Sequence, residues 1–521
     1  MAHIFAQTDT GGSGTMEMLT SSASKGIDLL GNIFLCVIGI ILAIFIVLFL
    51  IDILQTKDAV RRNYPVIGRF RGLFSTLGEF FRQYFFAMDR EEMPFNRAER
   101  DWINDVAKEG SSTEPFGSTR RLSPGSAIFA NGMFPKLDEE FEPTESVIIG
   151  PDTRRPYQPY SFFNISAMSY GSLSQPAIRA LSMGANLAGC WLNTGEGGLS
   201  PYHLEGNCDI VFQLGTAKFG ARNDDGSLNV DKLVKITTDH PNVRMIEVKL
   251  SQGAKPGKGG ILPAEKVTAE IAEIRGIPVG ESAISPNRHV DASTPEELLD
   301  LIHTMREATG IPVGIKFVVG NIADVEALLI AIKARGAQSA PDFFTIDGGD
   351  GGTGAAPMPL LDNVGLTIRE GLPAVDDLLM TYGLHERVRI IASGKLVTPA
   401  EVAWAFAAGA DFVNSGRGFM FALGCIQAMK CNENTCPTGI TTHNKRLQRG
   451  LDPENKATRV MHYCKSIRKD VEMISHSCGV DHPRQLRREH VLIVQDNGRS
   501  LPFSQVWGQR PRIGGKSKEA V

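Results

Sequence analysis

Eight short runs rich in β-branched or aromatic residues recur between residues 163 and 415, and stretches with helical character separate most of them. The runs read FNISAM, CWLNT, MIEVKL, ESAIS, VGIKFVV, DFFTID, VRIIAS and DFVNS. One helical stretch, TPEELLDLIHTMREATG, starts at the N-cap residue Thr294 and stops at Gly310. Strands that alternate with helices build a parallel sheet, and eight such units close into a (β/α)8 barrel. We therefore expect a TIM barrel over residues 161–491, with a doubly wound open sheet as the alternative.

Small residues gather directly after six of the expected strands. SAMSYGSLS follows the first strand, TGEGG the second, SQGAKPGKGG the third, DGGDGGTGAAP the sixth, SGKL the seventh and SGRGF the eighth. In a TIM barrel the functional site lies at the C-terminal ends of the strands, and the last two loops commonly hold a phosphate. Glycine lets backbone N–H groups come close to such a ligand. The pattern favours a phosphate-bearing cofactor, although a single glycine pair more often marks only a tight turn.

Cationic residues accompany these loops. Lys316 interrupts the apolar run VGIKFVV, and a lysine at the barrel mouth could donate to the electron-rich edge of a reduced flavin. The alternative is a lysine at a strand edge with no role in binding. Lys249, Lys255, Lys258 and Arg275 form a second group that suits a dicarboxylate, although Lys258 alone fits a solvated surface residue better.

Three of the eight cysteines lie within twelve residues, in the stretch GCIQAMKCNENTCPTG. Cys425, Cys431 and Cys436 have the spacing C-x5-C-x4-C, and no fourth ligand lies close enough for the usual zinc pattern. The other five cysteines are isolated, which favours a reducing compartment and argues against a disulfide. Three thiolates after the last barrel strand suit an iron–sulfur cluster.

The residues Leu29–Ile51 form a run of 23 without a charge, long enough to cross a membrane. A signal peptide is the alternative, but the run is longer than usual for one and no small-residue cleavage site follows. Positive charges follow the span, so the positive-inside rule places the catalytic part in the cytoplasm. The aromatic stretch Phe74–Phe86 either lies at the headgroup level or packs on the domain.

The net charge of −4 gives no support for nucleic-acid binding.

The remaining boundaries follow from these assignments. A short N-terminal segment covers residues 1–28, a juxtamembrane linker 52–92, a lead-in to the barrel 93–160 and a C-terminal tail 492–521, and the cysteine loop covers 425–436.

Five ordered motifs give the sequence a resemblance. ISAMSYGSLS, TGEGG, VKLSQGAKPGKGG, DGGDGGTGAAP and GCIQAMKCNENTCPTGI resemble the FMN-binding synthase domain of the glutamate synthase large subunit, over roughly residues 93–491. The resemblance implies a [3Fe-4S] cluster held by Cys425, Cys431 and Cys436. It implies FMN contacts from Ala167, Met168, Ser169, Gln252, Lys316, Gly348, Gly352, Thr353, Gly394 and Gly418. It implies contacts to 2-oxoglutarate from Glu196, Lys249, Gln252, Lys255 and Arg275.

The sequence departs from the family at three places. Ile261 replaces a glutamine of the presumed 2-oxoglutarate pocket, and SPNRHVD replaces SPPPHHD at residues 285–291. The glutaminase nucleophile of the family is an N-terminal cysteine, whereas position two here is Ala2. We therefore expect ammonia to come from elsewhere, such as an amidotransferase partner.

The resemblance implies an oxidoreductase that forms glutamate from a 2-oxo acid and ammonia, with electrons entering through the cluster. Glu196 and Lys249 are the candidate catalytic residues, and we expect burial to raise the pKa of Glu196 so that it handles a proton. Glu196 could instead only organise its loop. No GxGxxG fingerprint appears in a strand–helix context, which favours ferredoxin over a direct nicotinamide donor. The alternatives are a methylamine–glutamate N-methyltransferase type of transferase and a membrane electron-transfer protein with a vestigial pocket.

Overall fold

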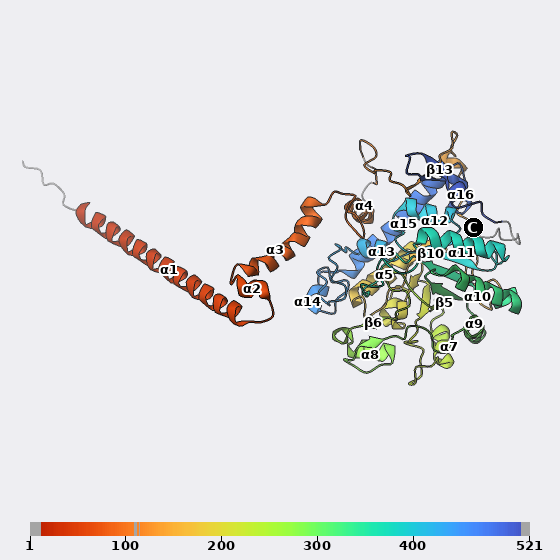
Figure 1. Ribbon diagram of the computed structural model, residues 1–521, viewed down its shortest axis with the longest axis horizontal. Helices are drawn as coiled ribbons and strands as arrows, with labels where there is room; N and C mark the ends of the chain where they lie inside the picture. The colour runs from red at the N-terminus through yellow and green to blue at the C-terminus, as the bar shows by residue number, and fades with distance from the viewer. Residues whose placement is uncertain (1–11, 109–111, 114, 512–521) are drawn as a thin grey trace, which may run out of the picture. The chain divides into compact units, whose positions relative to one another are not determined.

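The computed structural model describes residues 12–108, 112, 113 and 115–511. The ends of the expected N-terminal segment and C-terminal tail, residues 1–11 and 512–521, lie outside the described residues. The chain divides into two compact units, Met1–Arg97 and Ala98–Val521 (Figure 1).

The larger unit contains a closed barrel of parallel strands, which confirms the expected TIM barrel and excludes the open sheet. The closed order is β10-β11-β2-β3-β4-β5-β8-β9, so strands that follow one another in this set are neighbours. The barrel strands are β2 (Phe163–Ile165), β3 (Leu192–Asn193), β4 (Ile210–Leu214), β5 (Val243–Lys249), β8 (Val313–Phe317), β9 (Phe343–Asp347), β10 (Arg389–Ser393) and β11 (Phe412–Ser415).

One of the eight expected strands is wrong. The run ESAIS forms β7 (Ala283–Ile284), which pairs antiparallel with β6 (Ile261–Leu262) in a separate two-stranded sheet. The barrel strand that the sequence analysis overlooked is β4, which is buried at all five positions. A short strand buried on both faces has no alternation of apolar and polar residues, so periodicity does not single it out. SQGAKPGKGG therefore follows the fourth barrel strand rather than the third.

Helices surround the barrel (Figure 1). The expected cap signals of α9 (Pro295–Thr309) are confirmed, because Thr294 accepts a hydrogen bond from the N–H of Glu297 and Gly310 adopts a left-handed conformation at φ 73°. The other helices of this unit that frame the barrel are α5 (Gln175–Ala188), α7 (Val230–Asp239), α8 (Ala269–Arg275), α10 (Ile322–Arg335), α11 (Ile368–Thr381), α12 (Pro399–Ala407), α13 (Arg417–Ala422) and α15 (Pro453–Ser477).

A carboxylate lies deep inside the barrel. Glu247, on β5, is 1% exposed and accepts hydrogen bonds from Asn193 at 2.8 Å, Gln213 at 2.7 Å and Thr345 at 2.6 Å. These donors come from β3, β4 and β9, so one side chain links strands from different parts of the barrel wall. Such donors compensate a buried charge that would otherwise be costly.

The chain segments before and after the barrel pair with each other. Strands β1 (Ala127–Phe129), β12 (Val491–Val494) and β13 (Ser500–Pro502) form an antiparallel sheet in the order β1-β12-β13. The region assigned to a C-terminal tail therefore contains strands and the short helix α16 (Phe503–Val506).

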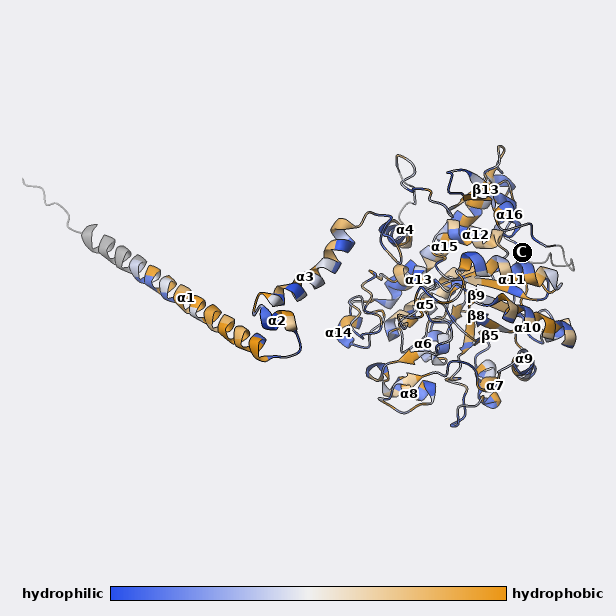
Figure 2. Cartoon of the chain, viewed as in Figure 1, coloured by the Kyte–Doolittle hydropathy of each residue, from blue (hydrophilic) through white to orange (hydrophobic). Residues whose placement is uncertain are grey.

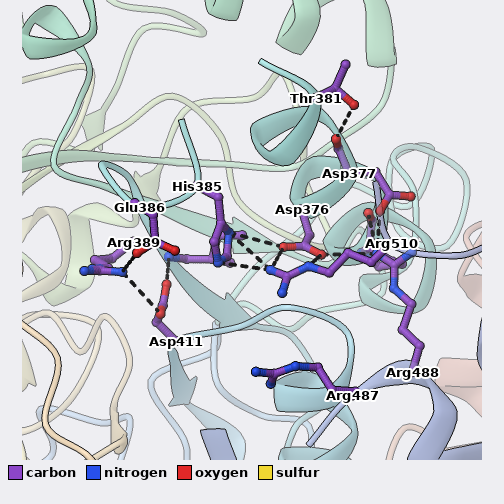
Figure 3. A network of polar contacts seen from close by, with 12 residues as sticks. Asp376, Asp377, Thr381, His385, Glu386, Arg389, Asp411, Arg487, Arg488 and Arg510 are labelled. Carbon is purple, nitrogen blue, oxygen red and sulfur yellow. Dashed lines mark hydrogen bonds and ion pairs between the residues drawn. The ribbon is translucent and has the colours of Figure 1, made fainter. Parts of the chain in front are cut away.

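Buried ion pairs fasten this C-terminal segment to α11 (Figure 3). Asp376 has no exposed side-chain surface and lies 3.2 Å from Arg488, and Arg510 donates to its carboxylate at 2.7 Å. Asp377 accepts from Arg488 at 2.6 Å and from the indole of Trp507 at 3.0 Å. Loss of one partner would leave the others buried and uncompensated.

The smaller unit begins with the long helix α1 (Gly12–Leu54) and continues through α2 (Ala59–Asn63), α3 (Gly68–Phe81) and the π-helix η1 (Arg82–Phe86). Residues Ser24–Leu54 of α1 are long and apolar enough to cross a membrane, and the expected span Leu29–Ile51 lies within them (Figure 2). A membrane anchor and a signal sequence both fit this description.

We predict that Asp376→Asn lowers the free energy of unfolding by about 3 kcal/mol, because it breaks a buried charge network. The matched control is Asp239→Asn, which removes an exposed pair with Lys235 and should lower the free energy of unfolding far less. Urea unfolding of the detergent-solubilised protein, followed by circular dichroism, measures both values. Equal stability losses in the two variants would contradict the prediction.

Candidate functional site

Two lysines stand side by side at the C-terminal end of the barrel. Lys249 on β5 is the register partner of Lys316 on β8, and the two are 6% and 5% exposed. Lys249 donates to Glu196 at 2.6 Å and to the side-chain oxygen of Gln252 at 2.8 Å. Lys316 lies 3.3 Å from Asp347, the last residue of β9. Each ammonium thus has its own carboxylate, which compensates for its burial.

The backbone around Glu196 leaves just enough room for its side chain. Glu196 lies in the turn Gly195–Gly197 that follows β3. A Cβ atom at Gly260 would lie 1.7 Å from its Oε1 atom, and one at Gly215 would lie 2.7 Å from its Cβ atom. These glycines come from the loops after β5 and β4, so three loops together determine where the carboxylate lies.

The net shift in the pKa of Glu196 is opposite to the expectation. Burial raises the pKa, but the positive charges of Lys249, Lys255 and Arg275 outweigh it and leave the pKa below its usual value of 4.5. The expected increase was wrong because the sequence does not show that three cations from separate segments converge on one carboxylate. Glu196 is therefore ionised at neutral pH.

Positive charge is in excess around Glu196. Three of the four residues in the expected cationic group, Lys249, Lys255 and Arg275, interact with this carboxylate, whereas Lys258 is exposed. Lys255 is 7% exposed and Arg275 is 3% exposed. Within the described part of the chain, the Lys255 side chain has no hydrogen bond or ion pair. Arg275 donates only to the carbonyl of Tyr170, at 3.3 Å, and its buried Nε atom lacks a partner there. Buried cations of this kind need an anion.

The loops after β5 and β9 meet at Thr353. Its hydroxyl accepts from Gln252 at 3.0 Å, and its carbonyl accepts from Arg417 at 2.6 Å. A Cβ atom at Gly352 would lie 2.7 Å from the Nε atom of Arg417, so the arginine needs a glycine beside it. Sequence reasoning overlooked Arg417, although it stands within SGRGF after the last strand.

The glycines at the ends of β9 and β10 are in direct contact. Gly348 donates to the carbonyl of Ser393 at 2.9 Å, and a Cβ atom at Gly394 would lie 2.9 Å from the Gly348 nitrogen. Gly394 also has φ 118°, which favours glycine. Gly418, on α13, is needed for packing, because a Cβ atom there would lie 2.0 Å from the hydroxyl of Tyr463.

The residues Ala167, Met168 and Ser169 follow β2 and pack on the loop after β3. Met168 donates to the carbonyl of Asn193 at 2.9 Å, and a Cβ atom at Gly195 would lie 2.8 Å from the Ser169 nitrogen. A buried histidine, His203, contacts the Met168 carbonyl through Nε2 at 2.8 Å. Burial lowers the pKa of His203 to about 4, so it is neutral and acts as a support for this loop. No sequence motif pointed to it.

The three cysteines lie on the loop that follows α13. The sulfur of Cys425 accepts from the N–H of Gln427 at 3.4 Å, and the sulfur of Cys436 lies 3.3 Å from the hydroxyl of Thr438. No group of three or more His, Cys, Asp or Glu side chains within the described ranges is placed to hold a metal ion. A single ion needs its thiolates within about 2.3 Å of one point, whereas the thiolates of an iron–sulfur cluster bind different iron atoms and lie farther apart.

A buried lysine supports the cysteine loop. Lys266 is 2% exposed and donates to the carbonyls of Cys431 and Thr441, both at 2.8 Å. It has no carboxylate partner among the residues described by the structure. An ammonium buried this way is stable only if other negative charge balances it. Thiolates on the adjacent loop would supply that charge, so the donor set fits an anionic cluster.

Comparison with known proteins gives a consistent family. The family described as "Conserved region in glutamate synthase" matches residues 130–481. The chain is 39% identical over 501 residues to the glutamate synthase large subunit-like protein YerD of Bacillus subtilis, covering 89% of this chain and 95% of that protein. It is 36% identical to the archaeal-type glutamate synthase (NADPH) of Dehalococcoides mccartyi, covering 62% of this chain and 61% of that protein.

Two further similarities are more limited. The glutamate synthase (NADPH) large chain of Bacillus subtilis is 32% identical over 340 residues, which cover 64% of this chain and 20% of that protein. Among solved structures, a crystal structure of mandelate oxidase has a TM-score of 0.42 at 14% identity, covering 70% of this chain and 87% of that one.

We predict that the ionised Glu196 contributes stability at neutral pH that is lost in acid. Its folded pKa lies below the usual 4.5, so the contribution is fully present above that pH and declines as pH falls through the folded pKa. The difference in free energy of unfolding between wild type and Glu196→Gln should be larger at pH 7 than at low pH. The exposed Glu265→Gln serves as control and should show a small difference throughout. A Glu196→Gln difference that grows on acidification would contradict the prediction.

Proposed function

The chain belongs to the glutamate synthase family, and on that premise we propose that it reductively aminates a 2-oxo acid, 2-oxoglutarate, to glutamate with ammonia made outside this chain. Membership makes the protein a glutamate synthase-type oxidoreductase. The choice of substrate is supported by the charges of the site.

The observation that carries the proposal is the excess of cations at the barrel mouth. Lys249, Lys255 and Arg275 act on a single carboxylate, Glu196, which leaves two positive charges uncompensated in this group. A 2-oxo dicarboxylate brings two negative charges and can accept several hydrogen bonds from Lys and Arg. The unpartnered Nε atom of Arg275 is one donor available for a carboxylate. Ile261, which replaces a glutamine of the family, lies on β6 and is 45% exposed. This replacement leaves all three cations of the group in place.

FMN is the cofactor that these loops suit. FMN would supply the hydride that reduces the imine of the 2-oxo acid. The loops after β9 and β10 are in direct contact at Gly348 and Gly394, and the buried Lys316 adds a positive charge. The residues that would hold FMN are Ala167, Met168, Ser169, Gln252, Lys316, Gly348, Gly352, Thr353, Gly394 and Gly418.

Glu196 and Lys249 would move protons during imine formation. As the ammonia nitrogen bonds to the 2-oxo carbon, the ionised Glu196 would accept a proton from that nitrogen. Lys249, whose ammonium lies 2.6 Å from Glu196, would donate a proton to the carbonyl oxygen, which becomes a hydroxyl. The proton on Glu196 then returns to Lys249, which restores the starting charges. A second transfer from nitrogen to oxygen by the same route breaks the C–O bond, so that water leaves and the imine forms. Glu196 thus acts as a base in this step, as its lowered pKa requires.

Cys425, Cys431 and Cys436 would hold a [3Fe-4S] cluster, which would supply single electrons. The buried cation of Lys266 beside their loop supports this assignment.

We propose ferredoxin as the electron donor, while relatives named for NADPH make a nicotinamide-linked partner the alternative. A separate amidotransferase is a suitable ammonia source. Leu29–Ile51 would anchor the protein in a membrane, with the barrel in the cytoplasm.

The decisive experiment uses detergent-purified protein reduced without oxygen. On addition of 2-oxoglutarate and ammonium we expect the visible flavin absorbance to return and glutamate to form in equal amount. Formation of N-methylglutamate from methylamine and glutamate, with release of ammonia, would instead show a transferase. A flavin that stays reduced with every 2-oxo acid would indicate an electron-transfer protein. Either of these results would overturn the proposal.

We predict that Gly260→Ala strongly lowers the turnover rate without loss of the fold. The added Cβ atom must displace the Glu196 carboxylate, which is the end of a flexible side chain, so the cost falls on the site. The rate constant should fall by about 10²-fold or more, as for loss of a general base, while FMN stays bound. Gly320→Ala is the matched control, because a Cβ atom there has no heavy atom within 4 Å. Turnover of Gly260→Ala at the rate of Gly320→Ala would show that the position of Glu196 is unimportant.

A further inference from the structure

An apolar stripe runs along α3 and η1 in the smaller unit. Its members recur three or four residues apart, the spacing of one helix face, and their exposed fractions range from 38% to 71%. They are Phe70, Leu73, Phe74, Leu77, Phe80, Phe81, Tyr84 and Phe85. Neighbouring rings contact each other along the helix, with centroids 5.1 Å apart for Phe80 and Tyr84 and 5.6 Å apart for Phe81 and Phe85. Within the smaller unit the stripe is continuous and exposed.

A buried carboxylate ties the start of α3 to the end of α1. Asp52, in the last turn of α1, has no exposed side-chain surface and pairs with Arg61 at 2.7 Å and Arg69 at 2.8 Å. It also accepts a hydrogen bond from the N–H of Val66 at 3.0 Å. Removal of either arginine would leave a charge buried without full compensation. The first turn of α3 therefore stays beside the end of the apolar helix.

The opposite face of α3 is polar, and its charges are mostly positive. Arg71 and Arg82 are exposed, and Glu79 is the one acidic residue of α3 and η1 within the described chain. Basic residues beside an aromatic face suit the boundary between anionic headgroups and acyl chains. Aromatic side chains are enriched at that depth, because their rings tolerate both environments. A stripe from residue 70 to residue 85 is about 24 Å long at 1.5 Å per residue, so many rings can enter the boundary together.

We propose that α3 and η1 lie in the plane of an anionic membrane surface, with the stripe inserted among the lipids next to the point where α1 crosses. This goes beyond the proposed reaction and does not depend on it; it requires only that α1 spans the membrane. The sequence left two possibilities for the aromatic stretch Phe74–Phe86, a place at the headgroups or packing on the domain. The Asp52 ion pairs favour the first, because they hold the stripe where the apolar helix ends. In this proposal, part of the segment 52–92 that was assigned as a linker is bound to the membrane surface.

The test places full-length protein in nanodiscs made from phosphatidylcholine and phosphatidylglycerol brominated near the headgroup. The test variant is Phe74→Trp, which puts a tryptophan within the stripe. The matched control is Ser75→Trp, which puts one on the polar face. The signal of the four native tryptophans is measured in wild type and subtracted. We expect bromine to quench Phe74→Trp at least about twofold more than Ser75→Trp, and the soluble quencher acrylamide to show the reverse order.

Each other result overturns the proposal. Protection of Phe74→Trp from both bromine and acrylamide would show that protein covers the stripe, either the barrel unit or a second copy. Strong acrylamide quenching at both positions would show that α3 and η1 lie in water and not among the lipids. Loss of α1 from the discs would identify a cleaved signal instead of an anchor. Glutamate formation by the same samples is scored separately, so failure of the membrane proposal and failure of the proposed reaction give different results.

Discussion

Two ammonium groups at adjacent strand ends impose the main constraint on the barrel mouth. Lys249 and Lys316 are register partners on neighbouring strands, and both are almost fully buried. Like charges this close repel strongly where water is scarce, so each needs a carboxylate from another element. Glu196 arrives on the turn after β3 and Asp347 at the end of β9, while Glu247 lies deeper in the barrel. The glycines that admit these side chains, such as Gly260, follow from the same requirement.

The insertion between β5 and β8 connects the two parts of the site. It carries Lys266, which donates to carbonyls of the cysteine loop and its neighbourhood, and Arg275, which closes α8 and reaches the group around Glu196. Thr268 caps α8 and Gly276 ends it, so the position of Arg275 depends on one short helix, while Lys266 lies in the 3-10 turn Ala264–Lys266 just before it. A substrate that binds Arg275 therefore contacts the same insertion that supports the cysteines. In the proposed enzyme this gives a direct structural route between the cluster and the substrate pocket.

Sequence reasoning succeeded where a local signal exists. Seven of the eight expected strands are barrel strands, because each is a short run rich in β-branched or aromatic residues. It failed for β4, whose five buried residues carry no alternation, and for Lys266, Arg417 and His203, whose partners are distant in the chain. The direction of the pKa shift of Glu196 was wrong for the same reason. Burial can be expected from a glycine-rich loop, but the convergence of three cations appears only in the folded chain.

The charge balance of the site also bears on the direction of the proposed reaction. A 2-oxo dicarboxylate carries two negative charges and matches the two uncompensated cations, whereas glutamate carries an additional ammonium group. That new positive charge would form near Lys249 and Lys255, where like charges interact strongly because the surroundings exclude water. In the proposed reaction the site would therefore bind the substrate better than the product, and the difference would grow once the amine is protonated. The positive charge of the product would then favour its release, while the carboxylate of Glu196 would limit the repulsion.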